Sequence, residues 1–429
     1  MSTSKNTGAE TGDHALPTPH SGKARIAVLC RHNLSRLEPG DTINTYDKIR
    51  ALARDTNAIL FAPQGYVSTD LHLLMRIVQV SPPGVRFTLA LVPALLLHMR
   101  DYDCIYSRDP LLMAFAVPMK MFGKMLAIEL HGIPSIETEV RRQTHEVRAP
   151  RLTRLICGCM RLIETFAIRS ADLTMPVTER MRVTLLRDYN VNERKITVVP
   201  NSVDTELFKP LETERTAIRR KFGIENQTVI LCLSTFSTSW RGSDRLFYIA
   251  NLVQHKRNDI VFLIVGSGPL LEEIRARSLD DNARRRMVFA GTVGYCVVPL
   301  YMNAADVYVY DVVNTANKLI QKQGLCPAKI LQAMSCGRPV IAPKAPDLET
   351  ILRNSGGGFS ASSLQEVEAL IEKFADSPEL ASSMGMNGRR YVQMNHDLTR
   401  LSKRKIELMT KVFYQKTRNV DKTCKIDLP

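Results

Sequence analysis

Short runs of apolar residues recur along the chain, and longer stretches with helical spacing separate them. In the first half, these runs lie at residues 25–30, 57–62, 103–108, 124–130, 173–177 and 196–199. Runs of this length are typical of strands that are buried on both faces of a parallel sheet. The stretches at 43–52 and 88–99 have the apolar spacing of helices. This alternation predicts a doubly wound α/β domain.

The same alternation begins again near residue 228. Apolar runs at 229–233, 260–265, 287–290, 307–310 and 339–342 predict strands, and residues 243–253 and 329–335 predict helices. Gly337 follows the second of these helices and suits a left-handed C-cap. Two such sets, joined around residues 200–210, predict two domains. Residues 1–22 are polar and predict a disordered tail, and residues 413–429 predict a loose one.

Composition and charge narrow the classes of function. The 429 residues are 45% hydrophobic with a net charge of +15, which favours anionic partners such as sugar nucleotides, acidic lipids or nucleic acid. Basic and aromatic residues do not interleave along the chain, so nucleic acid is not an expected partner. The sequence has nine cysteines and no Cys-x-x-Cys pair, and its N-terminal segment is polar. Both features predict a cytoplasmic protein. No cluster of His, Asp and Glu has metal-ligand spacing, so we expect no bound metal.

One segment between the two sets resembles a known family. Residues 198–210 read Val-Val-Pro-Asn-Ser-Val-Asp-Thr-Glu-Leu-Phe-Lys-Pro, which is similar to the interdomain segment of family 4 glycosyltransferases. In that family a glycine usually stands where Ser202 lies here. Asn201 could bond its own backbone in a turn, and Phe208 could fix the linker.

Four further segments resemble the same family in the expected order. They are Ser234 to Asp244, Ile264 to Pro269, Phe289 to Asp306 and Pro327 to Val340. The first half carries weaker likenesses around Gly40, 105–108, 129–132 and 171–172. The chain is thus identified as a member of the retaining glycosyltransferase family 4 (glycosyl transferases group 1).

This resemblance implies the GT-B fold, in which two Rossmann-like domains face a cleft. The acceptor domain would comprise residues 23–200, the nucleotide-sugar domain 201–384, and a C-terminal helix at 385–412 would cross back to the first domain. The implied reaction moves a sugar from a UDP-, GDP- or ADP-sugar to a glycan or lipid-linked acceptor, with retention and without a metal. It is a hexosyltransferase activity of glycan biosynthesis, in which the donor is a substrate and not a cofactor.

The reaction needs positive charge and amide donors near the departing diphosphate. Arg241 is the predicted catalytic cation, since it follows a strand and precedes Gly242; a solvated surface arginine is the alternative. The family's second basic residue is replaced here by Phe236. Gly266, Gly268 and Pro269 are predicted to bring backbone amides to the donor, although many such turns are only tight connections.

The helix near the donor departs from the family pattern. Its two usual glutamates, eight residues apart, are replaced by Gly324 and Gln332. Gln332 could still bond the ribose hydroxyls, or it could be an ordinary helix surface residue. Lys329 lies in a Pro-x-Lys pattern found in branches of the family that lack the first glutamate. The alternative function is a catalytically degenerate glycosyltransferase-like subunit that binds without turnover.

Polar residues at the ends of the first-domain strands are the acceptor-side candidates. His131 follows an apolar strand, at the end where open α/β sheets bind ligands, and the resemblance places it near the transferred sugar. Glu129 could orient His131 or be a core-edge carboxylate. Arg108 could hold the acceptor or form a surface salt bridge. Gly40 and Asp41 could meet the acceptor or serve the loop and helix cap.

Two apolar stretches raise the question of membrane contact. Residues 88–99 and 110–125 are apolar and flanked by basic residues, so they could contact the inner face of the cell membrane. The alternative is that they are core helices that pack on the sheet. The longest apolar run, 88–97, is about half of the length that a membrane span needs.

Overall fold

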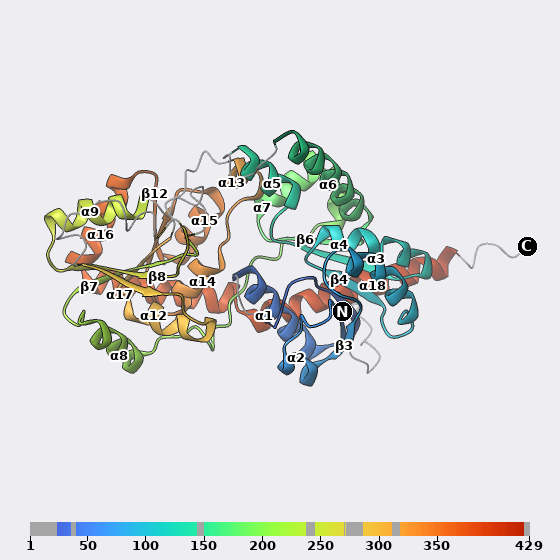
Figure 1. The fold of residues 1–429 in the computed structure, drawn as a ribbon, viewed down its shortest axis with the longest axis horizontal. Helices are drawn as coiled ribbons and strands as arrows, with labels where there is room; N and C mark the ends of the chain where they lie inside the picture. The colour runs from blue at the N-terminus through green and yellow to red at the C-terminus, as the bar shows by residue number, and fades with distance from the viewer. Residues whose placement is uncertain are drawn as a thin grey trace, which may run out of the picture.

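The computed structural model describes residues 24–35, 40–143, 150–236, 245–269, 271, 286–310 and 318–423. Two six-stranded parallel sheets dominate it, one in each half of the chain (Figure 1). The first sheet has the strand order β3-β2-β1-β4-β5-β6 and the second has β12-β11-β10-β7-β8-β9. Each order reverses direction beside its first strand, which is the doubly wound arrangement predicted from the alternating pattern.

The first sheet contains six short strands. They are β1 (Arg25–Leu29), β2 (Asn57–Ala62), β3 (Arg76–Gln79), β4 (Cys104–Ser107), β5 (Met125–Leu130) and β6 (Leu173–Pro176). Alternate residues of β1 point to opposite faces: Ile26 and Val28 join one core, and Ala27 and Leu29 join the other. Since both faces are buried, the strands read as continuous apolar runs.

Different helices cover the two faces of this sheet. One face carries α3 (Val85–Leu97), α4 (Pro110–Ala116), α6 (Pro150–Ser170) and α7 (Glu179–Asp188), with α5 (Pro134–Gln143) packed against α6. The other carries α1 (Gly40–Asp55), α2 (Thr69–Leu74) and α18 (Leu398–Thr423). The short 3-10 helix η1 (Val117–Phe122) continues from α4.

The second sheet follows the same plan. Its strands are β7 (Thr228–Leu233), β8 (Ile260–Val265), β9 (Met287–Gly291), β10 (Val307–Val309), β11 (Val340–Pro343) and β12 (Gly358–Ala361). One face packs on α8 (Glu212–Phe222), α12 (Val298–Ala304), α14 (Ala328–Ser335), α15 (Pro346–Ser355) and α17 (Pro378–Asn395). The other packs on α9 (Arg245–Lys256) and α16 (Leu364–Asp376).

The structure corrects the prediction of several strands and of the C-terminal tail. Residues 196–199 form no strand, only an isolated bridge between Thr174 and Ile196. The pattern missed β3 and β12, which are edge strands with partly exposed residues. The predicted loose tail from residue 413 is instead helical as far as Thr423, because α18 packs through Met409 and Phe413 on the first sheet. Gly337 has the predicted left-handed φ of 72°.

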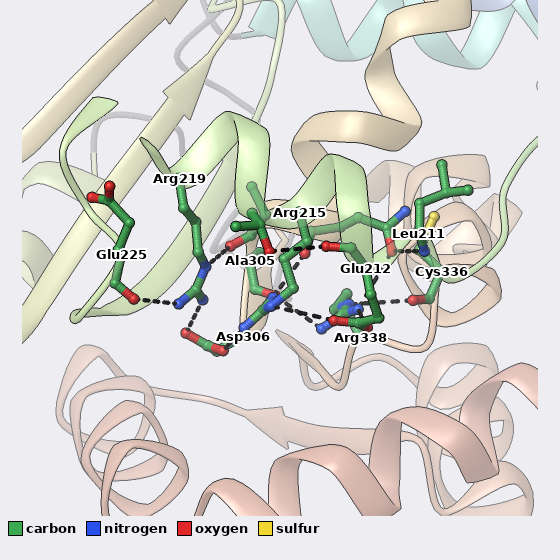
Figure 2. Close-up of polar contacts among 12 residues, drawn as sticks. Leu211, Glu212, Arg215, Arg219, Glu225, Ala305, Asp306, Cys336 and Arg338 are labelled. Carbon is green, nitrogen blue, oxygen red and sulfur yellow. Dashed lines mark hydrogen bonds and ion pairs between the residues drawn. The ribbon is translucent and has the colours of Figure 1, made fainter. Parts of the chain in front are cut away.

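An arginine cluster stabilises the amino-end edge of the second sheet (Figure 2). Asp306, just before β10, binds Arg215 and, at 2.6 Å, Arg219, and it accepts the Val229 amide at 2.8 Å. The arginines also donate to backbone carbonyls at the end of α12, at Asn303, Ala304 and Ala305. A pocket of about 480 Å³ lies beside the cluster. These donors serve the fold, and doubly wound sheets bind their ligands at the opposite, carboxyl-end edge.

Candidate active site

A buried network of charged and polar side chains lies where β4 and β5 end. Its centre is Glu129, the fifth residue of β5, whose side chain is completely buried. Lys48 from α1 lies 2.7 Å from Oε1 of Glu129, and Lys405 from α18 lies 2.5 Å from Oε2. The Tyr106 hydroxyl donates to Oε2 at 2.6 Å. Three elements distant in sequence therefore converge on one carboxylate.

Two of the predicted residues join this network. His131 Nε2 lies beside Oε1 of Glu129 and 2.8 Å from the Lys48 ammonium. This nitrogen can donate to Glu129 or accept from Lys48, according to the histidine tautomer. Arg108 Nε lies 4.0 Å from the same carboxylate oxygen, and its guanidinium also donates to Thr45 on α1. The predicted contact between Glu129 and His131 is present in the structure.

The electrostatics of the network set the charge of its members. Burial alone would raise the pKa of Glu129, but Lys405, Lys48 and the contact with His131 together outweigh burial and hold that pKa well below its usual value. Burial, together with Arg108 and Lys48, lowers the pKa of His131 well below its usual value. The result is an ionised carboxylate beside a neutral imidazole.

Exposure distinguishes the members that could meet a ligand from those that support them. The His131 side chain is 15% exposed, whereas those of Arg108, Lys405 and Lys48 are 7%, 5% and 2% exposed. His131 is therefore the member best placed to reach a bound molecule. Arg108 is not a surface salt bridge, which was one alternative of the sequence analysis.

Gly40 and Asp41 begin α1, the helix that also carries Thr45, Asp47 and Lys48. The structure thus places the two acceptor-side candidates on the same element as partners of Arg108 and Glu129.

Asn201 connects this network to the second domain. Its Oδ1 accepts from Lys48 at 3.0 Å, and its Nδ2 donates to the Cys326 carbonyl at 2.7 Å. The side chain thus links two domains and does not close a local turn, which corrects the sequence reading. His396, in the loop between α17 and α18, lies 2.8 Å from the Asn201 carbonyl. Phe208 is fully buried, as expected of a residue that fixes the linker.

The donor-side candidates lie at the carboxyl ends of β7 and β8. Gly266 and Gly268 have φ values of 125° and 156°, and a Cβ at either position would collide with the backbone of residues 234–236. The two loops therefore pack backbone against backbone, which requires glycine. Pro269 follows and is exposed. Lys329 of α14 reaches the same edge and donates to the Leu233 carbonyl at 3.2 Å.

The positions that depart from the family have physical explanations here. Phe236, which replaces the family's second basic residue, has no charge, and its ring is buried in the core with a φ of 43°. Gly324 has φ 71°, and a Cβ there would meet Thr178 at 2.8 Å and also Asp347. Gln332 is only 9% exposed, which rules out the surface reading, and it interacts with the Tyr295 hydroxyl.

Tyr295 and a short helix join the two domains on either side of this region. The Tyr295 hydroxyl donates to Asp47 of α1 at 2.7 Å. Helix α13 (Lys318–Gln323) packs against α5 and α7 of the first domain, and the Gln323 carbonyl accepts from Thr178. Both contacts were missed by sequence reasoning, because no local pattern marks a residue that bonds across domains.

Two further predictions concern Arg241 and the absence of metal ligands. Arg241 lies outside the described residues. An Asp-x-Asp sequence occurs at Asp101 and Asp103, although no metal-ligand cluster was expected. These carboxylates lie at the amino end of β4, where Asp101 pairs with Arg76 at 3.0 Å and Asp103 with Arg25 at 2.5 Å. They are ion-pair partners away from the carboxyl-end edge.

Two families match consecutive parts of the sequence. Glycosyltransferase Family 4 matches residues 45–207, and Glycosyl transferases group 1 matches residues 227–377. These ranges contain every strand of the two sheets except β1, and every candidate residue except Gly40 and Asp41. The chain belongs to the glycosyltransferases of the GT-B fold.

The following two characterised proteins are distant relatives of this chain. A GDP-mannose-dependent alpha-(1-6)-phosphatidylinositol monomannoside mannosyltransferase of Mycolicibacterium smegmatis is 26% identical over 214 residues, covering 49% of this chain and 55% of that one. A UDP-Gal:alpha-D-GlcNAc-diphosphoundecaprenol alpha-1,3-galactosyltransferase of Escherichia coli is 22% identical, covering 64% and 66%. The chain thus spans about half the length of the mycobacterial relatives that it matches.

Solved structures share the fold over most of the chain. Sucrose-phosphate synthase of Thermosynechococcus elongatus has a TM-score of 0.71 at 17% identity, covering 92% of this chain and all of that one. HepE of Anabaena in complex with UDP has a TM-score of 0.69 at 17% identity, covering 90% and 100%. Among the residues that the structure describes, no helix combines the length and the apolarity needed to cross a membrane.

Proposed function

We propose that this glycosyltransferase moves a hexosyl unit from a nucleotide sugar to a glycan or lipid-linked acceptor, with retention of configuration and without a resident metal or cofactor. The observation that supports this most is the joint placement of two loops. The glycine turn at Gly266 and the His131 network both lie at the carboxyl ends of their parallel sheets, where doubly wound folds bind ligands.

The relatives support the classes of donor and acceptor. Those named above are described as GDP-mannose-dependent and as using UDP-Gal, and the structural neighbour from Anabaena was solved with UDP. Phosphatidylinositol monomannoside and diphosphoundecaprenol, in the names of the relatives, are both lipids. We therefore propose a UDP- or GDP-hexose as donor and a lipid-linked acceptor, with an ADP-sugar as a further donor to test.

Each candidate residue has a physical role in this proposal. Negative charge builds on the departing diphosphate, and Arg241, Lys329 and the amides near Gly266 would stabilise it. Protein cations would thus do the work that a divalent metal does in other transferases. The neutral imidazole of His131 would hydrogen-bond the transferred sugar, and Gln332 would hold the ribose.

The acceptor would lie on the first-domain side, near the start of α1. Gly40 and Asp41 begin this helix, and Arg108 bonds Thr45 one turn further on. Lys48, Lys405 and Arg108 surround one carboxylate, so the network around Glu129 carries an excess of positive charge. That excess favours an acceptor with a phosphate or diphosphate group.

A second candidate function is a subunit that binds a nucleotide sugar without turnover. Phe236 is buried and Gly324 leaves no room for a side chain, so two charges usual in the family are missing.

Turnover with a panel of UDP-, GDP- and ADP-sugars separates the two functions. We expect nucleotide release with at least one donor, and a loss of most turnover in Arg241→Ala. Arg220→Ala, at an exposed position of α8, is the control. Nucleotide binding without release or transfer, from any donor, favours the binding subunit instead.

A further inference from the structure

Helix α6 is apolar on two opposite faces. One face packs on the first sheet through Ala167 and Ile168, and Cys157 on the same side of the helix is also buried. The other carries Leu155, Leu162 and Phe166, which are 66%, 73% and 55% exposed. These three residues, with the exposed Cys159, recur at intervals of four, three and four, so they form one stripe along the helix. The helix thus presents a solvent-facing apolar stripe that the core does not use.

Helix α3 repeats this arrangement. Phe87, Leu91 and Leu95 are buried in the core, while Leu89 and Leu97 are 64% and 82% exposed on the opposite side. Residues 88–99 therefore include a helix that packs on the core through one face, as one alternative of the sequence analysis expected, and exposes apolar side chains on the other face. Met121 and Phe122 of η1 add exposed side chains at 88% and 50%.

These elements lie on one side of the molecule. Helices α3 and α6 both pack against α4, and all three cover the same face of the first sheet (Figure 1). Side chains that point away from that sheet therefore point in a common direction. Exposed apolar side chains that gather on one side of a protein mark an interaction surface. We call the exposed apolar residues of α3, η1 and α6 the apolar surface.

The charge of the apolar surface selects its partner. Glu164 is the only acidic residue in α3, α4, η1 and α6, and it is fully buried, where it accepts the Ser135 amide at 2.9 Å. Arg86, Arg154 and Arg161 are exposed on α3 and α6. Apolar stripes flanked by arginines, without exposed acids, match the headgroup and acyl boundary of an anionic bilayer.

We propose that the apolar surface docks this protein on an anionic lipid bilayer, with α6 lying in the plane of the interface. Leu155, Leu162 and Phe166 enter the acyl boundary, and Arg86 and Arg154 meet lipid phosphates. The proposal does not depend on sugar transfer, because binding to lipid requires neither donor nor acceptor.

Flotation with vesicles tests this proposal. Wild-type protein should float with phosphatidylcholine vesicles that contain phosphatidylglycerol, and less with phosphatidylcholine alone. The double variant Leu162→Ser/Phe166→Ser should lower the partition coefficient at least about ten-fold. The variant Arg86→Gln/Arg154→Gln should weaken binding to the anionic vesicles specifically.

Leu73→Ser provides the matched control. Leu73 is 89% exposed on α2, which covers the opposite face of the sheet, so its loss should leave flotation unchanged. The proposal is overturned if the wild-type protein stays unbound, or if Leu162→Ser/Phe166→Ser floats as well as the wild type. It is also overturned if sedimentation shows a dimer that this double variant dissociates, without vesicle binding, since a second copy would then cover the surface. Nucleotide-sugar turnover in detergent-free buffer reports separately on the proposed function.

Discussion

Lys405 of the returning helix α18 places its ammonium 2.5 Å from Oε2 of Glu129, in a position that is almost closed to solvent. The C-terminal helix therefore supplies a charge to the site of the first domain. Lys405 acts on His131 only through Glu129, so it is a positioning residue. The fold couples the last helix to the residue we propose to contact the sugar.

Replacing Lys405 should be costly. Lys405→Met leaves Glu129 buried with one cation fewer, and we expect a loss of about 3 kcal/mol in the free energy of unfolding. Urea denaturation measures this loss. The double variant with Glu129→Gln should lose less than the sum of the single variants, because the two side chains interact. Lys403→Met, exposed on the same helix, is the control. Equal effects of Lys405→Met and Lys403→Met would contradict the coupling.

Asp47 should make stability depend on pH. Burial raises its pKa to about 6, although the Tyr295 hydrogen bond and Arg50 act in the opposite direction. Since the folded pKa lies above the usual value, the folded state holds this proton more tightly. The stabilising contribution is complete below about pH 4 and is lost as the pH rises through about 6.

Asp47→Asn should remove this dependence. From about pH 4 to pH 7, the wild-type protein should lose on the order of 2 kcal/mol relative to the variant, as measured by denaturation at both values. A difference between wild type and variant that is the same at both pH values would show that Asp47 does not carry the effect.

The glycine turn after β8 should not tolerate a side chain. Gly266→Ala forces a Cβ into the Ser234 carbonyl at φ 125°, so the loop must move away from β7. We expect a loss of about 1–3 kcal/mol in stability and weaker nucleotide binding. Thermal unfolding and nucleotide titration measure the two effects. Gly294→Ala is the control, since its Cβ meets nothing within 4 Å. Unchanged nucleotide binding in Gly266→Ala would remove this turn from the donor site.

Restoring the family's first glutamate should not restore a missing function. Gly324→Glu places a side chain against Thr178 and Asp347, with a φ of 71°. The interdomain contact should open, and stability and turnover should both fall. Gly123→Glu has a similar φ of 75° but open space, so it isolates the backbone cost. A gain of turnover in Gly324→Glu would contradict this packing.

Both sheets could be predicted because their central strands are buried on both faces and read as apolar runs. The edge strands β3 and β12 could not, since Arg76, Gln79 and Ser360 break the apolar pattern. Residues 196–199 were wrongly predicted to be a strand for the opposite reason. They are apolar, but they form only one isolated bridge, at Ile196.

The site could be predicted only where residues follow strands. His131, Glu129 and Arg108 stand at strand ends, so their convergence follows from the topology. Lys48 and Lys405 resemble ordinary helix lysines in sequence. Their burial depends on how α1 and α18 pack on the sheet, which no local pattern specifies.

The central claim is that the edge of the first sheet marked by His131 takes part in sugar transfer. The most direct test is the turnover of His131→Ala with the best donor, compared with His72→Ala on the exposed side of α2. We predict a loss of about a hundred-fold in His131→Ala, with folding intact by circular dichroism, and no loss in His72→Ala. Wild-type turnover in a folded His131→Ala protein would contradict the assignment of this site.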